Sequence, residues 1–123
     1  AELTDKILTS FYSFRNKLQI ELDLSFFKNA LEIELLENGL VVEKNKDHEI
    51  IYKQKSIGKL TTDLIVNEKV VIKLVAENLE ISEKHSIEMK NFLRLTNYEL
   101  GLILNFGADG NHKRILLTNN FKS

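Results

Sequence analysis

The hydrophobic residues of the N-terminal third follow the three- and four-residue spacing of amphipathic helices. This spacing predicts a first helix over Thr4–Leu18, with Thr4 as its N-cap. A second helix is predicted over Ser25–Asn38, and Gly39 suits the left-handed backbone at which helices commonly stop. The chain is therefore expected to open with two helices that pack through apolar faces.

After Gly39 the pattern changes to short apolar runs of strand length, separated by polar turns. Four strands are predicted before the next helix, and the first two are expected to pair as a hairpin. Asn67 and Glu68 form a tight turn between the last two strands. The four predicted strands are Leu40–Lys44, Glu49–Lys53, Leu60–Val66 and Lys69–Ala76.

The last third of the chain contains one more helix and two more strands. Ser82 is a candidate N-cap for a helix over Glu83–Thr96. Tyr98–Phe106 is almost wholly apolar, which predicts a central strand buried on both faces, and Lys113–Thr118 is a candidate edge strand. Asn119–Ser123 is expected to be a frayed tail.

The predicted order is ααββββαββ, which indicates an α/β or α+β fold with a mixed sheet flanked by helices. The passage from Val70 to Leu104 through the third helix is long enough for a crossover, which would make the two strands parallel. Because the chain shows no linker or repeat, residues 1–123 are expected to form a single domain.

Composition narrows the class of function. The 17 Lys and Arg residues nearly balance 18 Asp and Glu residues, which argues against a general nucleic-acid binder, since such binding comes from phosphate neutralisation. Cysteine is absent, which excludes disulfides and thiol catalysis and is typical of a reducing, cytoplasmic compartment. No apolar run is long enough to span a membrane, and we expect no membrane partner.

Four sequence blocks occur in an order and spacing that is similar to a known family. They are Thr62–Val66, Val71–Ala76, His85–Leu93 and Gly101–Gly107. In these blocks the chain resembles the GxxExxY family, a branch of the PD-(D/E)xK nuclease-like superfamily. The N-terminal helices also look similar, up to Asn38–Leu40. The resemblance implies a restriction-endonuclease-like fold, a bacterial origin and, for active members, Mg²⁺-dependent cleavage of phosphodiesters.

The positions that the family uses for chemistry differ in this chain. The family's strand motif supplies a Glu and a Lys two residues apart, and here those positions hold Lys73 and Val75. A helix Gln common in such nucleases falls at Glu88. The Gly, Glu and Tyr of the GxxExxY motif fall at Glu21, Leu24 and Phe27. Of the acidic and catalytic residues that the resemblance implies, only Asp63 survives, as a vestigial site residue.

A site with Asp63, Lys73 and Val75 suits Mg²⁺ poorly. Mg²⁺ in a nuclease is held by carboxylate oxygens, and one carboxylate beside an ammonium offers too little negative charge. Residues 73 and 75 are expected to share one face of their strand with Val71, while the opposite face packs on the core. We therefore predict that Lys73 occupies the place of the ion and pairs directly with Asp63, and that no cofactor is bound.

Other interpretations of these residues stay open. Asp63 is alternatively a surface residue of an edge strand, and Lys73 a solvated strand residue. Glu77 and Glu80 are weaker candidates for relocated metal ligands, and Glu88 is expected on a solvated helix face rather than toward the site. The histidines form no ligand cluster in the sequence: His48 is expected to be exposed in a turn, His85 starts a helix, and His112 lies in a loop.

One set of basic residues could contact phosphates. Lys90 and Arg94 are four residues apart and share a helix face, but Glu83 and Glu88 interleave with them, which favours a plain solvated surface. The candidate nucleic-acid-binding residues are Lys84, Lys90, Arg94, Lys113 and Arg114.

The leading hypothesis for function is a catalytically inactive nuclease-like domain that acts as an interaction or structural module. Apolar residues occupy more than one side of the second helix, which favours a protein partner or a homodimer. One alternative is an active Mg²⁺-dependent nuclease whose Glu77, Glu80 or Glu88 converges on Asp63, with Lys84 or Lys90 replacing the strand lysine. The other is a non-catalytic nucleic-acid-binding protein. The apolar residues of the helix are Phe26, Phe27, Ile33 and Leu36.

Overall fold

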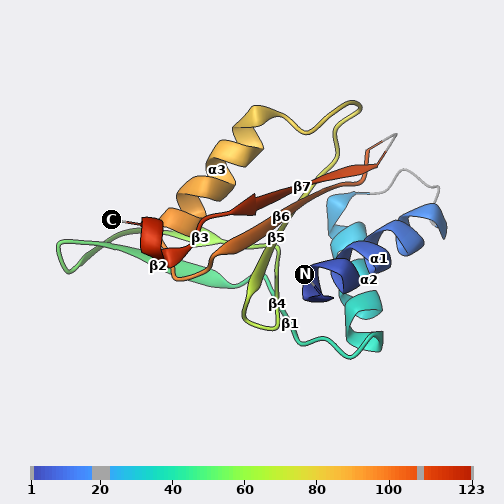
Figure 1. Ribbon diagram of the computed structural model, residues 1–123, viewed down its shortest axis with the longest axis horizontal. Coiled ribbons are helices and arrows are strands. Elements are labelled where there is room, and N and C mark those ends of the chain that lie inside the picture. The colour runs from blue at the N-terminus through green and yellow to red at the C-terminus, as the bar shows by residue number, and fades with distance from the viewer. Residues whose placement is uncertain (1, 18–22, 108–109, 123) are drawn as a thin grey trace.

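The computed structural model describes residues 2–17, 23–107 and 110–122 (Figure 1). Two helices come first, and a third helix lies between the fifth and sixth strands. The helices are α1 (Glu2–Lys17), α2 (Leu24–Glu37) and α3 (Glu83–Arg94), and a short 3₁₀ helix, η1, covers Asn119–Phe121. The strands are β1 (Val42–Lys44), β2 (Asp47–Tyr52), β3 (Lys55–Thr61), β4 (Leu64–Val66), β5 (Val70–Val75), β6 (Leu100–Asn105) and β7 (Asn111–Leu116).

Five of the strands form a mixed sheet in the order β1-β4-β5-β6-β7, and β2 and β3 form a separate two-stranded ribbon. The α+β class with a mixed sheet is therefore confirmed. β5 and β6 are parallel, as predicted from the crossover, with Ile72 opposite Leu102. The tight turn between β4 and β5 is also confirmed, because Asn67 and Glu68 both have positive φ, 52° and 56°. β6 is buried beside the edge strand β7.

The predicted hairpin between the first two strands is wrong. β1 pairs with β4, placing Glu43 opposite Ile65, whereas β2 pairs with β3, placing His48 opposite Leu60. The predicted strand Leu60–Val66 is divided at Thr62 and Asp63, which gives one strand more before α3 than expected. A backbone hydrogen bond at the break, from the N–H of Thr62 to the carbonyl of Lys46, keeps the ribbon continuous with the sheet.

Several predicted ends of elements also change. α1 begins at Glu2, so Thr4 is not its N-cap but a buried residue within the helix, and Leu18 lies outside the described residues. Gly39 has φ 80° and ends α2 as predicted. The C-terminal tail is ordered through Lys122 and not frayed as predicted. The Nζ of Lys122 donates hydrogen bonds of 2.8 and 2.6 Å to the carbonyls of Thr96 and Tyr98. Ser123 lies outside the described residues.

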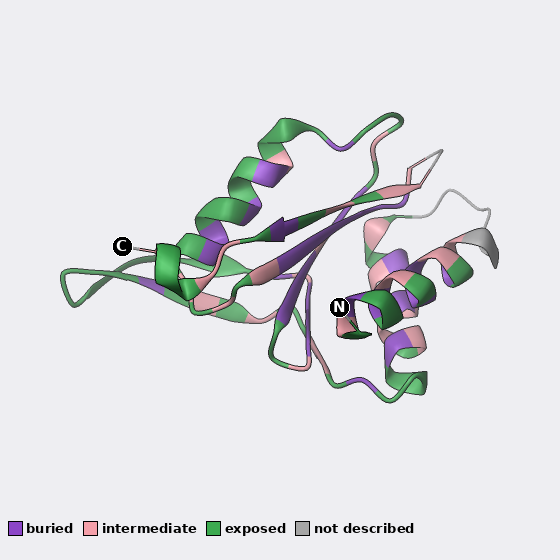
Figure 2. Cartoon of the chain, in the orientation of Figure 1, coloured by how far each residue is buried: buried purple, intermediate pink, exposed green. Residues whose placement is uncertain are grey.

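The sheet separates two hydrophobic clusters, one on each face (Figure 2). The even-numbered residues of β5 pack against α1 and α2, and the odd-numbered Val71 and Val75 pack against α3, which confirms the predicted alternation. On the first face Phe27 stacks on Phe106 with ring centroids 4.6 Å apart. The ribbon is mostly exposed in contrast, and every residue of β3 is exposed.

None of the three helices in the described part of the chain combines the length and apolar character needed to cross a lipid bilayer.

Candidate functional site

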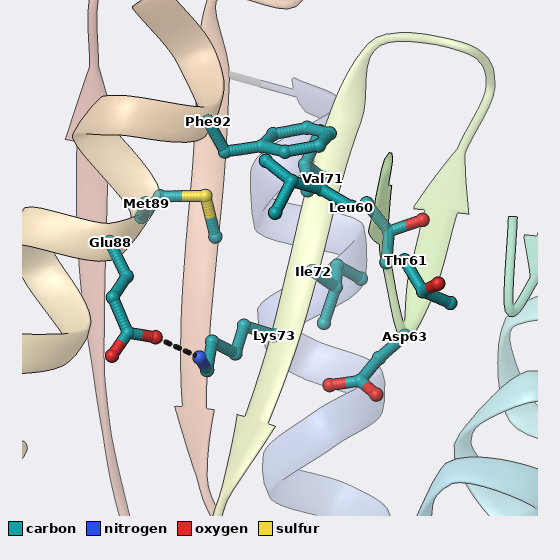
Figure 3. A pocket seen from close by; sticks show the side chains of 10 residues that line it. Leu60, Thr61, Asp63, Val71, Ile72, Lys73, Glu88, Met89 and Phe92 are labelled. Atoms are coloured by element: carbon teal, nitrogen blue, oxygen red, sulfur yellow. Dashed lines mark hydrogen bonds and ion pairs between the residues drawn. The ribbon is translucent and has the colours of Figure 1, made fainter. Parts of the chain in front are cut away.

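A pocket of about 280 Å³ opens between β5, α3 and the end of the ribbon (Figure 3). β5 forms its floor, α3 forms one wall, and the chain between β3 and β4 forms the other. Its lining joins apolar and charged side chains, so a bound group would meet both. The lining residues are Leu60, Thr61, Thr62, Asp63, Val71, Ile72, Lys73, Glu88, Met89 and Phe92.

Asp63 is held at the break between β3 and β4 by donors on both of its carboxylate oxygens. Oδ2 accepts the backbone N–H of Leu74 at 2.9 Å, because β4 reaches β5 only from Leu64, opposite Ile72, and the carboxylate supplies the next acceptor along the strand. Oδ1 lies 3.0 Å from the Nζ of Lys28 on α2. Asp63 therefore has a structural role in tying β4 to β5 and α2 to both.

Lys73 extends from β5 to α3, where its Nζ lies 2.7 Å from Oε2 of Glu88 (Figure 3). The hydrogen bond from Lys73 lowers the pKa of Glu88 below its ordinary value. The predicted Lys73–Asp63 contact is wrong: both residues line one pocket, but Lys73 pairs with Glu88 and Asp63 pairs with Lys28. Glu88 faces this pocket rather than only solvent, contrary to expectation.

Lys28 is the residue at this site that the sequence reasoning missed. It lies four residues after Leu24, to which the resemblance assigned the Glu of the GxxExxY motif, so both belong to one face of α2. That spacing is the signal that could have identified it. Glu21, to which the resemblance assigned the Gly of the GxxExxY motif, lies outside the described residues.

Val75 does not take part in the pocket. It is 4% exposed and belongs to the hydrophobic cluster beneath α3, together with Ile81 and Leu93. On the face of β5 toward α3, Lys73 is therefore flanked by two buried valines. The position to which the resemblance assigned the lysine of the strand motif is thus part of the core.

Glu77 bonds to Ser82, the N-cap residue of α3, and does not line the pocket. Its carboxylate accepts hydrogen bonds from the backbone N–H and the hydroxyl of Ser82 at 2.8 and 2.6 Å, and these bonds lower the pKa of Glu77. His85 Nε2 lies 3.6 Å from the same carboxylate. Ser82 is at the N-cap position as predicted, but its hydroxyl bonds to Glu77 and not to the helix. Glu80 is exposed in the same loop.

The residues present do not fit the Mg²⁺ that the fold family implies. Mg²⁺ is bound through one or two free carboxylates together with water and phosphate oxygens. Here Asp63 and Glu88 each face an ammonium group, and residues 2–17, 23–107 and 110–122 contain no group of three Asp, Glu or His side chains that could hold a metal. Neither Glu77 nor Glu80 lines the pocket beside Asp63.

Two histidines lie in strands and not in loops. His48 is in β2, where its ring packs edge-on against Phe92 with centroids 5.2 Å apart, so it is half-buried rather than exposed. His112 is in β7, and its Nδ1 lies 2.6 Å from the hydroxyl of Tyr12 on α1. Both histidines therefore connect layers of the fold.

The structure divides the predicted basic surface. Lys84, Lys90 and Arg94 are exposed on α3. Lys113 faces α3, where its Nζ lies 4.0 Å from Glu83. Because side chains alternate along a strand, Arg114 shares the opposite face of β7 with His112, toward α1. The five residues are thus not one patch.

The fold and the pocket define a nuclease-like α+β domain. The two carboxylates of its pocket, Asp63 and Glu88, are each ion-paired with a lysine. The model of the PD-(D/E)XK nuclease superfamily matches residues 1–115, and the chain belongs to this family.

Among solved structures, the chain is similar to the crystal structure of SSO0001, with a TM-score of 0.61 and 20% identity over 76% of this chain. This match supports the fold alone, and the chain spans only 50% of that protein. No curated protein matches the sequence.

Proposed function

We propose that this chain is a nuclease-like domain of the GxxExxY branch that has lost metal-dependent catalysis and serves as an interaction or structural module. The observation that carries the proposal is the state of the pocket's two carboxylates. Asp63 and Glu88 are each paired with a lysine, at 3.0 and 2.7 Å, and one of these lysines, Lys73, stands where the resemblance places the Glu of the strand motif.

Hydrolysis of a phosphodiester requires an activated water and a centre of positive charge at the phosphate oxygens. The two ammonium groups are already satisfied by carboxylates, and the buried Val75 offers no group to orient or activate water. The pocket therefore has neither unpaired carboxylates to bind a divalent ion nor a free base to activate water.

Support for an interaction module comes from the outer face of α2, defined here by Phe26, Ile33 and Leu36. These side chains are 57%, 57% and 50% exposed, while Phe27 on the inner face is buried. The prediction that apolar residues occupy more than one side of this helix is therefore confirmed. Such an apolar surface on a helix favours contact with protein, and a second copy of this chain is the partner to test first.

The catalytic half of the proposal is tested with the unmodified protein. Incubation with plasmid DNA, single-stranded DNA and RNA in Mg²⁺ or Mn²⁺ should give no cleavage, and neither ion should raise the melting temperature. Metal-dependent cleavage that disappears in Asp63→Asn would overturn the proposal in favour of an active nuclease.

The interaction half is tested by sedimentation equilibrium over a range of protein concentrations. We expect concentration-dependent association that Ile33→Glu abolishes. Ile87→Glu on α3 is the matched control, because Ile87 is a helical isoleucine of similar exposure, 51%, away from α2. Association that is absent, or equally sensitive to both variants, would contradict a role for this face in self-association.

A further inference from the structure

We propose that Lys28 and Lys73 together replace the divalent cation of this fold, so that charge supplied by the chain itself holds the pocket's carboxylates in place. The inference rests on the proposed loss of catalysis and goes beyond it, because it assigns a role to Lys28, which was not among the predicted site residues. It follows from the mismatch between the pocket and a metal ion.

Lys28 is positioned as a resident ligand of Asp63 and not as a mobile surface charge. Its Nζ donates to Oδ1 of Asn45 at 2.8 Å and contacts Oδ1 of Asp63 at 3.0 Å. Its side chain is only 19% exposed. One ammonium therefore joins α2 to the link between β1 and β2 and to the start of β4, three segments that converge at the pocket's edge.

Lys73 forms the second ion pair of this pocket, with α3 instead of α2. It connects the middle of the strand with Glu88 on α3, as the dashed contact in Figure 3 shows. Each lysine thus bridges β-structure to a different helix. A metal ion in such a fold draws carboxylates together from neighbouring elements, and here two ion pairs do so separately.

The charges of these four residues sum to zero without a bound ion. A divalent ion entering the pocket would have to separate two ion pairs and approach two like charges. A unit charge about 6 Å from a divalent ion in a water-like dielectric weakens binding by roughly tenfold, and less screening increases the effect. Removing the lysines should therefore expose carboxylates that can attract a metal.

The test compares Mn²⁺ binding to the unmodified chain and to the double variant Lys28→Met/Lys73→Met. Binding is followed by the loss of the free Mn²⁺ signal in electron paramagnetic resonance and by the shift of melting temperature. We expect the double variant to bind Mn²⁺ at least about tenfold more tightly than the unmodified chain. Lys28→Arg/Lys73→Arg keeps both charges and should bind no better than the unmodified chain.

A gain that disappears when Asp63→Asn is added to the double Met variant would locate the ion at this pocket. If the Met variant loses its native circular dichroism, Lys28→Gln/Lys73→Gln replaces it, since this variant removes the charges and keeps polar head groups.

The two proposals fail in different ways. A folded double variant that binds Mn²⁺ no better than the unmodified chain would overturn the role of the lysines and leave the loss of catalysis standing. Mn²⁺ binding to the unmodified chain at Asp63, equal to that of the double variant, would overturn both. A gain that survives Asp63→Asn would also contradict the inference, because the ion would then lie elsewhere.

Discussion

The two faces of β5 differ in composition: one is entirely apolar and buried, and the other contains an ion-paired lysine. On the face toward α1 and α2, Val70, Ile72 and Leu74 are buried in a cluster that also holds the aromatic rings of both helices. On the face toward α3, Val71 and Val75 are just as buried, but Lys73 between them is partly exposed and ion-paired. The pocket opens beside this second face, where Lys73, Glu88 and Met89 line it.

This difference indicates that different residues of β5 determine the stability of the fold and the chemistry of the site. The first face has no polar position, so each change there alters packing directly. The second face contains one polar position whose partner, Glu88, is nearly half exposed. A partly exposed ion pair contributes little to stability, so we expect the charge at position 73 to be changeable without loss of the fold.

The strongest test of the comparison is a pair of substitutions at adjacent residues. Ile72→Ala removes a side chain with no exposed area, and we expect it to lower the free energy of unfolding by about 4 kcal/mol. Lys73→Ala should lower it by about 1 kcal/mol or less, because only a partly exposed pair is lost. Urea denaturation measures both, and equal losses would contradict the separation of the two faces.

The second test places a lysine at position 75, where the resemblance to the family expects one. Val75→Lys places a charge at a position that is 4% exposed, and we expect a loss of about 3 kcal/mol at neutral pH. Val75→Met, an apolar control of comparable length, should lose less.

The pH dependence of Val75→Lys has a defined sign. Burial lowers the pKa of the new amine in the folded state, so the unfolded state binds more protons, and the stability lost should be regained as pH rises toward the ordinary lysine value. A loss that matches the Met variant, or that does not shrink at alkaline pH, would show that the position accepts a solvated lysine.

Periodic signals in the sequence predicted the parts of the fold that depend on local pattern. The alternation along β5, the turn at Asn67 and Glu68 and the stop at Gly39 follow from side-chain and backbone preferences that act over a few residues. The pairing of β1 with β4 was not accessible in this way. It depends on contacts between residues far apart in the sequence, such as Val42 opposite Val66, which no local pattern indicates.

The candidate site was predicted as a set of positions but not as a set of contacts. Lys73 and Asp63 both line the pocket, yet the sequence could not choose among the available ionic partners. That choice depends on where α2 and α3 pack, which placed Lys28 beside Asp63 and Glu88 beside Lys73. Lysine side chains are long and flexible, so one ammonium group can meet any of several carboxylates. Tertiary packing, and not spacing along the sequence, therefore determines which ion pairs form.

The smallest expected effect is the contribution of the Lys73–Glu88 pair to stability. The hydrogen bond from Lys73 lowers the pKa of Glu88 in the folded state, so its stabilisation is present above the ordinary value of 4.5 and is lost as pH falls through the lower folded value. Glu88→Gln should therefore lose about 1 kcal/mol or less at neutral pH, since the pair is partly exposed, and the difference from the unmodified chain should shrink below about pH 4.5.

A double-mutant cycle with Lys73→Met isolates this pair from other effects of either substitution. The coupling free energy should fall both on acidification and with added salt, because charge carries the interaction. A coupling that exceeds the loss from Ile72→Ala, or that stays constant into acid, would show that the pair is part of the core, and the two faces of β5 would then no longer differ in kind.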